Sequence, residues 1–237
     1  MKQSTTLCLI LICGIFLFAT SCKKNDYLTD DGVHDAKTAL NTYDYLKSNQ
    51  YKLFDTFLLV LDKFNLSEEL INAKTVFAVT DYSIKRYMDM RTALLKIFDE
   101  SKVYTLDSLY KDMTADSVRQ YFFNEKITLA DAVTEPEVTQ FTSKGKTPAG
   151  FSKRIWTILE LNGNDAGLST WTNTPAYGLY YTRIRGMLDV PGVIPPANEI
   201  DIKVLCQTTG ILPSSAKDPS YEQVLHVLSN QHTFVRF

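Results

Sequence analysis

The histidines offer the most versatile side-chain chemistry in this chain, and there are three of them, His34, His226 and His232. His226 and His232 flank Ser229-Asn230-Gln231, where a turn is predicted, so their imidazoles are able to meet. Two imidazoles supply about half of the ligands of a closed zinc site. The sequence has no His-Glu-x-x-His, paired Cys-x-x-Cys, EF-hand loop, phosphate loop or Gly-x-Ser-x-Gly. We therefore predict no metal, no cofactor and no enzyme activity. A hydrolase with a dispersed Ser, His and Asp is the enzymatic alternative.

One cysteine stands where a covalent modification is predicted. The apolar run from Leu7 to Ala19 is short of the roughly 20 residues that cross a bilayer, and it is typical of a secretory signal. It ends in small residues immediately before Cys22, which resembles a bacterial lipobox, where the signal is cut before a cysteine that is then acylated. Ala19 stands where that pattern prefers Leu. We predict a lipoprotein signal peptide over 1–21 and lipidation of Cys22. The alternative is a signal cut elsewhere, with Cys22 incidental.

The remaining cysteines predict no disulfide. The chain has four, of which Cys8 and Cys13 leave with the signal and Cys22 carries lipid. Cys206 then has no partner, and it lies in an apolar, alternating stretch. We interpret it as a small buried hydrophobic residue rather than a catalytic thiolate.

Aromatic side chains are concentrated in one part of the chain. They are Trp156, Trp171, Tyr177, Tyr180 and Tyr181. Aromatic faces stack on sugar rings and anchor protein interfaces, so this set is a candidate binding surface. Packing within the core is the alternative. Trp171 has polar neighbours on both sides and is the best candidate for exposure.

The composition excludes several classes of protein. The 237 residues are 45% apolar and 22% charged, which is ordinary for a folded chain and excludes disordered and polytopic membrane proteins. The formal net charge of −2, from 25 basic and 27 acidic residues, argues against a nucleic-acid partner. The length suits one large domain or two small ones.

The periodicity predicts helices first and strands later. Residues 22–35 are polar and are interpreted as the acylated cysteine followed by a flexible tether. Helical spacing is found over 36–48, 51–64, 68–73, 82–98 and 114–123, with Ser67 as a helix cap. Strands are predicted over 75–79, 154–161, 177–187 and 200–207, followed by a terminal pair, 223–228 with 233–237. This order indicates an α+β fold.

Two segments resemble the signatures of the fasciclin domain family. The first is Thr75–Asp81, an apolar strand followed by Thr-Asp and a helix, and the second is the late strand Gln223–Leu228 around His-Val. Residues 118–131 look like the family's middle helix and the segment after it. The resemblance covers most of 36–237, and the surplus length is assigned to an insertion around 135–176. The residues that match the family motifs are Thr75, Phe77, Thr80, Asp81, Tyr121 and His226.

The resemblance implies a bent β-sandwich with a bundle of N-terminal helices. Within it, Thr80 and Asp81 are expected to cap the helix that follows them, and His226 is expected to be a hydrogen-bonded core residue. Two positions depart from the family pattern. Val79 replaces a Pro, and the family's Tyr-His pair, tied to adhesion in some members, reads here as Tyr121-Phe122.

The expected function follows from the resemblance and the anchor. We expect an outer-membrane lipoprotein of Bacteroidota type, periplasmic or surface-exposed, that acts as an adhesion or protein-binding module. Members of the family in Bacteroidota often accompany polysaccharide uptake, which implies an accessory role there. The alternative is a glycan-binding surface lipoprotein that uses the aromatic residues of 156–181. The expected partners are the membrane through the lipid and an envelope protein or a glycan.

Overall fold

The computed structural model describes residues 36–155, 177–189, 192–214 and 222–235. The chain divides between Asp35 and Ala36, and the description below concerns the second unit, Ala36–Phe237. The predicted signal, Cys22 and tether lie outside the described residues, as do Trp156 and Trp171.

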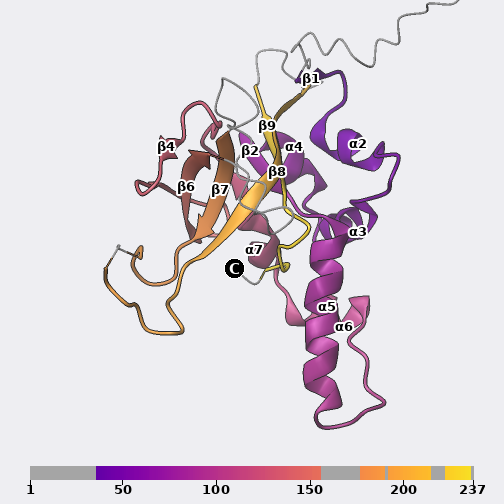
Figure 1. Ribbon diagram of the computed structural model, residues 1–237. Helices are drawn as coiled ribbons and strands as arrows, with labels where there is room; N and C mark the ends of the chain where they lie inside the picture. Colours follow the sequence, from indigo (N-terminus) through magenta and orange to yellow (C-terminus); the bar gives the residue numbers. More distant parts are fainter. Residues whose placement is uncertain (1–35, 156–176, 190–191, 215–221, 236–237) are drawn as a thin grey trace, which may run out of the picture. The chain divides into compact units, whose positions relative to one another are not determined.

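A curled mixed sheet organises this unit (Figure 1). Its strands follow the order β3-β2-β9-β8-β7-β6-β4, while β1 pairs with β8 and β5 pairs with β6. The bounds are β1 Lys37–Thr38, β2 Thr75–Ala78, β3 Phe122–Phe123, β4 Val133–Thr134, β5 Thr139–Thr142, β6 Pro148–Ile155, β7 Tyr177–Arg183, β8 Ile202–Pro213 and β9 Val224–Leu228.

Strand β8 joins the two parts of the sheet. Its first residues pair antiparallel with β7, and from Cys206 onward it pairs antiparallel with β9. The register with β9 shifts twice between Cys206 and Ile211, and Gly210 within this irregular stretch has a φ of +76°. Such bulges bend a strand and increase its twist, which explains how one strand serves both parts of a curled sheet.

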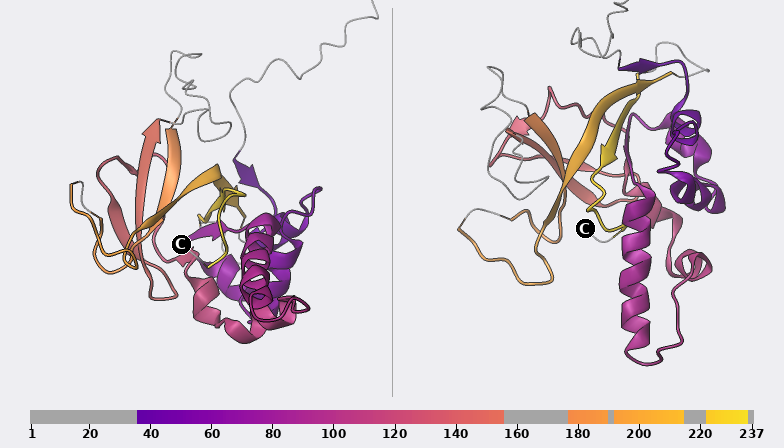
Figure 2. Two further views of the ribbon diagram at one scale, coloured as in Figure 1. Left: turned by 60° about the horizontal axis from the view of Figure 1, so that its bottom comes forward. Right: turned by 45° about the vertical axis from the view of Figure 1, so that its right-hand side comes forward.

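The helices gather on one side of the sheet, as Figure 2 shows. Their bounds are α2 Thr42–Lys47, α3 Asp55–Lys63, α4 Ser67–Asn72, α5 Asp81–Lys96, α6 Leu106–Asp112 and α7 Ala115–Arg119. Helices α2, α3 and α4 contact one another, and α3 also contacts α5. Helices α6 and α7 each begin with a reciprocal capping box, Thr105 with Ser108 and Thr114 with Ser117.

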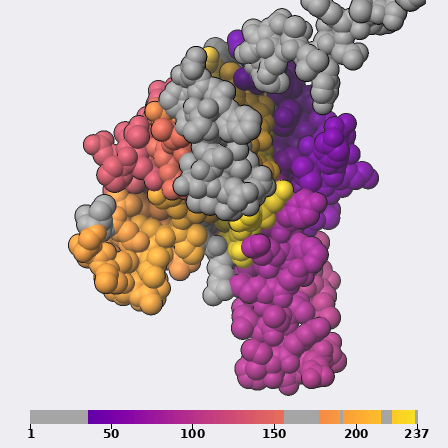
Figure 3. All heavy atoms as spheres, in the orientation of Figure 1, coloured from indigo at the N-terminus to yellow at the C-terminus, as the bar shows by residue number. Residues whose placement is uncertain are grey.

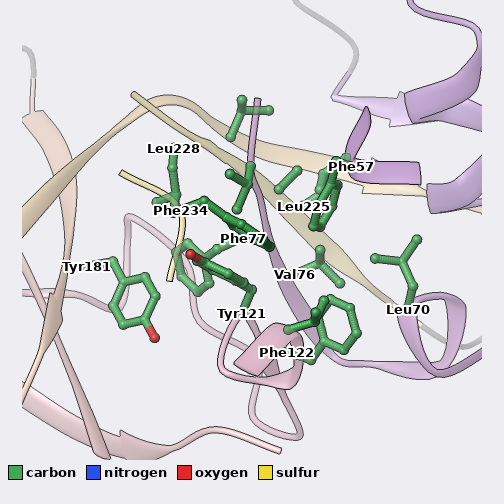
Figure 4. Close-up of a cluster of buried hydrophobic side chains, with 14 of the residues drawn as sticks. Phe57, Leu70, Val76, Phe77, Tyr121, Phe122, Tyr181, Leu225, Leu228 and Phe234 are labelled. Atoms are coloured by element: carbon green, nitrogen blue, oxygen red, sulfur yellow. The ribbon is translucent and has the colours of Figure 1, made fainter. Parts of the chain in front are cut away.

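Phe77 lies at the centre of the aromatic core (Figure 4). Its ring stacks on Phe151 with 5.1 Å between centroids and contacts Phe123 edge-on at 5.7 Å. Tyr181 and His226 also contact it, at 5.1 and 5.0 Å. One motif residue of β2 therefore connects strands β3, β6, β7 and β9.

The α+β class is confirmed, while the fasciclin-like sandwich and the bundle of N-terminal helices stay predictions. The middle helix was predicted wrongly. It ends at Arg119, and Phe122-Phe123 forms β3 because both rings are buried and pair with β2. The helix predicted over 36–48 begins only at Thr42, since Lys37–Thr38 pairs with β8.

Two further expectations were wrong, and one helix was missed. Residues 223–228 do not pair with the described residues 233–235, because β9 already has β2 and β8 on its two sides. Ser67 is the first residue of α4 rather than its cap, and its hydroxyl donates to Asp62 at 2.7 Å. Helix α6 was not predicted at all.

Candidate functional site

The two late histidines lie in separate hydrogen-bond networks. His226 faces Phe77 across the β2–β9 pairing, donates from Nε2 to the carbonyl of Ile127 at 2.9 Å and accepts at Nδ1 from Gly210 N at 3.3 Å. Burial lowers the pKa of its imidazole to about 4, so the ring is neutral at physiological pH. Both ring nitrogens are satisfied by backbone, which fits the structural role expected for His226.

His232 is the histidine partner of Tyr121. The Tyr121 hydroxyl accepts from Val235 N at 2.9 Å and shares a hydrogen bond of 2.9 Å with His232 Nε2. Burial lowers the pKa of His232 to about 3. A histidine thus contacts Tyr121 although its sequence neighbour is Phe122. His226 and His232 do not share a site, although their spacing in the sequence would allow their imidazoles to meet.

Asp81 caps a different helix from the one predicted. Thr80 precedes α5 without a side-chain cap bond, whereas the Asp81 carboxylate accepts from Thr56 N at 3.0 Å and from Phe57 N at 3.2 Å. These are free N–H groups of the first turn of α3, which has no cap of its own. Asp81 is also the first residue of α5, so one carboxylate faces the positive ends of two helices.

Thr75 has the same kind of internal role. Its hydroxyl donates to the carbonyl of Glu125 at 2.7 Å and accepts from Ile127 N at 2.9 Å. It is fully buried at the start of β2. The bonds fix the segment that follows β3 against β2, so Thr75 is structural.

The described tyrosines of the candidate binding surface do not form an exposed platform. Tyr181 is wholly buried, lies in the core shown in Figure 4, and donates to Gln120 O at 2.8 Å, so it is a core residue. Tyr180 is 3% exposed, and the Arg154 guanidinium lies 4.6 Å from its ring centroid. Tyr177 is partly exposed, with Lys153 Nζ at 5.9 Å from its ring. The rings of Tyr180 and Tyr181 are therefore not available for stacking on a sugar, whereas the ring of Tyr177 is exposed.

Cys206 is buried and free, as predicted. Burial raises the pKa of its thiol well above the ordinary value. The thiolate, which is the nucleophilic form, is therefore not available at neutral pH.

The described ranges hold no group of three or more His, Cys, Asp or Glu side chains suited to a metal ion. None of the helices in those ranges has the length and apolarity needed to cross a bilayer.

One feature that sequence reasoning missed is an apolar surface at the end of α5. Leu94, Ile97, Phe98 and Val103 are exposed there, and we call them the α5 tip patch. Phe98 is 91% exposed and Ile97 is 73% exposed, which is unusual for such large apolar side chains. Figures 1 and 3 show this end of α5 projecting away from the sheet. The available signal was Ile97-Phe98 next to Asp99-Glu100, at the end of the helix predicted over 82–98.

The α5 tip patch is held rigidly by polar contacts beneath it. Tyr104 N donates to the Thr92 hydroxyl at 3.0 Å, which folds the chain after Val103 back onto α5. Arg91 and the Tyr104 hydroxyl both bind Asp112 at 2.9 Å, which ties α6 to α5. The Asp99 carboxylate accepts from Ser101 N and Oγ at 3.0 and 2.7 Å, which fixes the turn.

A second missed feature is a cavity of about 610 Å³ where β7 ends and β8 begins. It draws its polar lining from three segments, namely Glu135, Thr182 with Asp189, and Asp201 with Lys203. We call it the β7–β8 pocket. No sequence motif predicts this pocket, because its residues come together only through strand pairing.

No protein-family model, curated protein or solved structure matches this chain significantly.

Proposed function

We propose that this chain is a non-enzymatic lipoprotein of the cell envelope that binds another envelope protein through the α5 tip patch. The observation that carries the proposal is the exposure of Ile97 and Phe98 on a projecting, rigidly held turn. Exposed apolar patches on a folded surface mark interaction sites. An aromatic ring that becomes buried when the complex forms is a frequent anchor of an interface.

The rigidity of the turn favours binding. A backbone turn that is ordered before association loses less conformational freedom on association, so more of the apolar contact is realised as affinity. The charged residues around the patch are of both signs, with Lys102 paired to Asp99 at 3.8 Å. The partner surface that fits is therefore an apolar pocket with a mixed polar rim. The resemblance to the fasciclin family fits a binding module, but the Tyr-His pair tied to adhesion in some members is absent here, so the proposal rests on the α5 tip patch itself.

The chemistry of the candidate catalytic groups supports the non-enzymatic part. His226 and His232 are neutral and bonded within the core, and the Cys206 thiol is protonated. The lipid on Cys22 would confine the protein to a surface, where a high local concentration lets a weak contact suffice.

The double substitution of Ile97 and Phe98 by Ser is expected to abolish partner binding without unfolding the protein. The side chains are exposed, so the free energy of unfolding should change by only about 0.5 kcal/mol. The measurement is co-purification of the tagged full-length protein from gently solubilised envelope, with partner stoichiometry read by mass spectrometry. We expect at least a tenfold loss of the partner.

The matched control is Leu59→Ser. Leu59 is an exposed apolar residue of α3 outside the α5 tip patch. The same chemical change there should leave the partner stoichiometry as in the parent protein. A stoichiometric partner that is retained equally by the parent, the tip variant and the control would refute binding through this patch.

Substitution of Cys22 by Ser is expected to release the protein from membranes and to abolish fatty-acid labelling. The acyl chains are attached through this cysteine in the lipobox interpretation, and the substitution removes the thiol while keeping its size. Membrane fractionation and incorporation of labelled palmitate are the measurements. Cys206→Ser is the control and should be labelled fully, because that thiol is buried in the core. Persistent labelling of Cys22→Ser would show that the anchor lies elsewhere.

A further inference from the structure

A cavity of about 700 Å³ lies between the first half of β8 and α5 (Figure 1). Along 202–205, β8 pairs with β7 on one side, whereas its pairing with β9 begins only at Cys206, so the other edge of this stretch borders the cavity. The opposite wall is the turn that contains Ser229 and Thr233, with Met90 of α5 beside it. We call this the β8 edge pocket, and it shares only Lys203 with the β7–β8 pocket.

The charged side chains that line the β8 edge pocket are all basic. They are Arg154, Arg185 and Lys203, and within the described ranges no Asp or Glu belongs to the lining. Arg154 and Lys203 lie at 4.6 and 5.9 Å from the ring centroid of Tyr180, so one ring positions both cations. A cleft lined by charges of one sign concentrates ions of the opposite sign, so this lining favours an anionic ligand.

Two acidic residues that contact the same segments do not cancel this charge. Glu135 pairs with Lys203 at 2.7 Å from outside the lining, and it accounts for one of the three cations. Asp201 accepts from the backbone N–H groups of Arg185 and Asp189, at 2.7 and 3.0 Å, and it lines the β7–β8 pocket instead. The β8 edge pocket therefore keeps an excess of positive charge.

The turn opposite the basic side chains supplies neutral polar groups. Ser229, Gln231 and Thr233 line the pocket, and their hydroxyl and amide groups both donate and accept hydrogen bonds. The turn is held in place, since Ser229 N donates to Leu205 O at 2.9 Å and Gln231 N donates to the Ser229 hydroxyl at 3.2 Å. The site is thus formed before a ligand arrives, which reduces the entropic cost of binding.

The two walls together decide the ligand class. A guanidinium presents paired N–H groups that match the oxygens of a carboxylate, sulfate or phosphate. An inorganic oxyanion would bind the basic side chains and leave the turn unused. A sugar that carries an oxyanion uses both walls, because its ring hydroxyls bond to the turn. Met90, Ile202 and Leu205 add apolar surface for the C–H groups of the ring.

We propose that the β8 edge pocket binds an acidic sugar, with the oxyanion on Arg154 and Arg185 and a ring hydroxyl on Thr233. The volume of about 700 Å³ is within the usual range for small-molecule sites. This site is separate from the α5 tip patch and goes beyond the proposed protein interface.

Arg185→Gln is the first test. It removes one positive charge from a basic lining, so the free protein should be as stable as the parent, whereas the affinity for an acidic sugar should fall about tenfold or more. A loss of affinity without a loss of stability is an outcome that a merely structural role would not produce. Arg86→Gln, at an exposed position of α5 outside the lining, is the matched control and should leave the affinity unchanged.

The probes pair each acidic sugar with its neutral counterpart and with the bare oxyanion. Galacturonate, galactose 6-sulfate and galactose 6-phosphate are compared with galactose, and with acetate, sulfate and inorganic phosphate, which shows which oxyanion is preferred. Binding to the full chain is measured by calorimetry and saturation-transfer NMR. At least one acidic sugar should bind more tightly than galactose and than its bare oxyanion, and added salt should weaken it.

Thr233→Val tests the contact with the ring. It replaces a hydroxyl by a methyl group of nearly the same size, so it should weaken binding of the acidic sugar by a few fold and leave binding of the bare oxyanion unchanged. The double Ser variant of Ile97 and Phe98 should bind the sugar as the parent does, which separates failure of this proposal from failure of the protein interface.

Four results would overturn the proposal. They are no binding of any acidic sugar by the folded chain, binding of galactose as tight as that of the acidic sugars, binding of a bare oxyanion as tight as that of the sugar that carries it, and equal binding of the acidic sugar by the parent and by Arg185→Gln or Thr233→Val.

Discussion

Acidification from pH 7 to pH 4 is expected to lower the free energy of unfolding of this protein by about 6 kcal/mol through its two buried histidines. An unfolded histidine has a pKa of about 6.5, whereas burial lowers the folded values to about 4 for His226 and about 3 for His232. The unfolded chain therefore binds two protons that the folded chain does not bind in this window.

The sign and the window follow from this difference. Stability rises with pH wherever the unfolded chain binds more protons, so it is lost as the pH falls from about 6.5 toward the folded pKa values. Each histidine contributes about 3 kcal/mol by pH 4. Small domains have about 5–15 kcal/mol in total, so the loss is large enough to bring the protein close to unfolding. Urea titrations between pH 7.5 and pH 4 measure it.

Substitutions by Gln separate this effect from general acid denaturation. The Gln amide keeps a donor for Ile127 O at position 226 and an acceptor for the Tyr121 hydroxyl at position 232. The double Gln variant should be less stable at pH 7 but should lose much less stability on acidification. His34→Gln, in the predicted tether, should show the same dependence of the free energy of unfolding on pH as the parent. If the parent and the double variant show the same slope, the histidines do not control the acid response.

The sequence predicted the elements whose signals are local. The buried strand at Thr75–Ala78 and the helix after it follow from an unbroken apolar run and a helical period. Helix α7 begins at Ala115, one residue after the start of the helix predicted over 114–123, because its capping residue Thr114 acts on its own neighbours. The helical spacing over 114–123 wrongly includes Phe122-Phe123, because their strand character comes from pairing with β2, which lies far away in the sequence.

The functional residues were harder to predict for the same reason. Tyr181 belongs to an aromatic cluster, but which of two adjacent tyrosines faces the core is decided by the register between β6, β7 and β8. Aspartate is a residue type that favours helix capping, but which helix Asp81 caps is determined by how α3 packs against α5. The lining of the β7–β8 pocket comes from segments that are far apart in the sequence, which no periodicity predicts.

Gln223 illustrates how much stability such a long-range contact carries. Substitution by Leu is expected to lower the free energy of unfolding by about 3–5 kcal/mol, because three buried groups lose their partner. The Gln223 amide donates to the carbonyls of Leu70 and Ala73, both at 2.7 Å, and its oxygen accepts from the Thr42 hydroxyl. The side chain is 3% exposed and connects the start of β9 to helices α2 and α4.

The same substitution at Gln207 is the matched control. The Gln207 oxygen accepts from Asn230 N at 3.2 Å at an exposed position, so water can replace it, and Gln207→Leu should cost less than about 1 kcal/mol. Gln223→Glu distinguishes hydrogen bonding from packing. It keeps the shape of Gln223 but places an acceptor against two carbonyls, so at neutral pH it should be at least as destabilising as Leu. Chemical denaturation measures all three variants. A Gln223→Glu protein as stable as the parent would show that packing, and not donation to Leu70 and Ala73, is what this residue contributes.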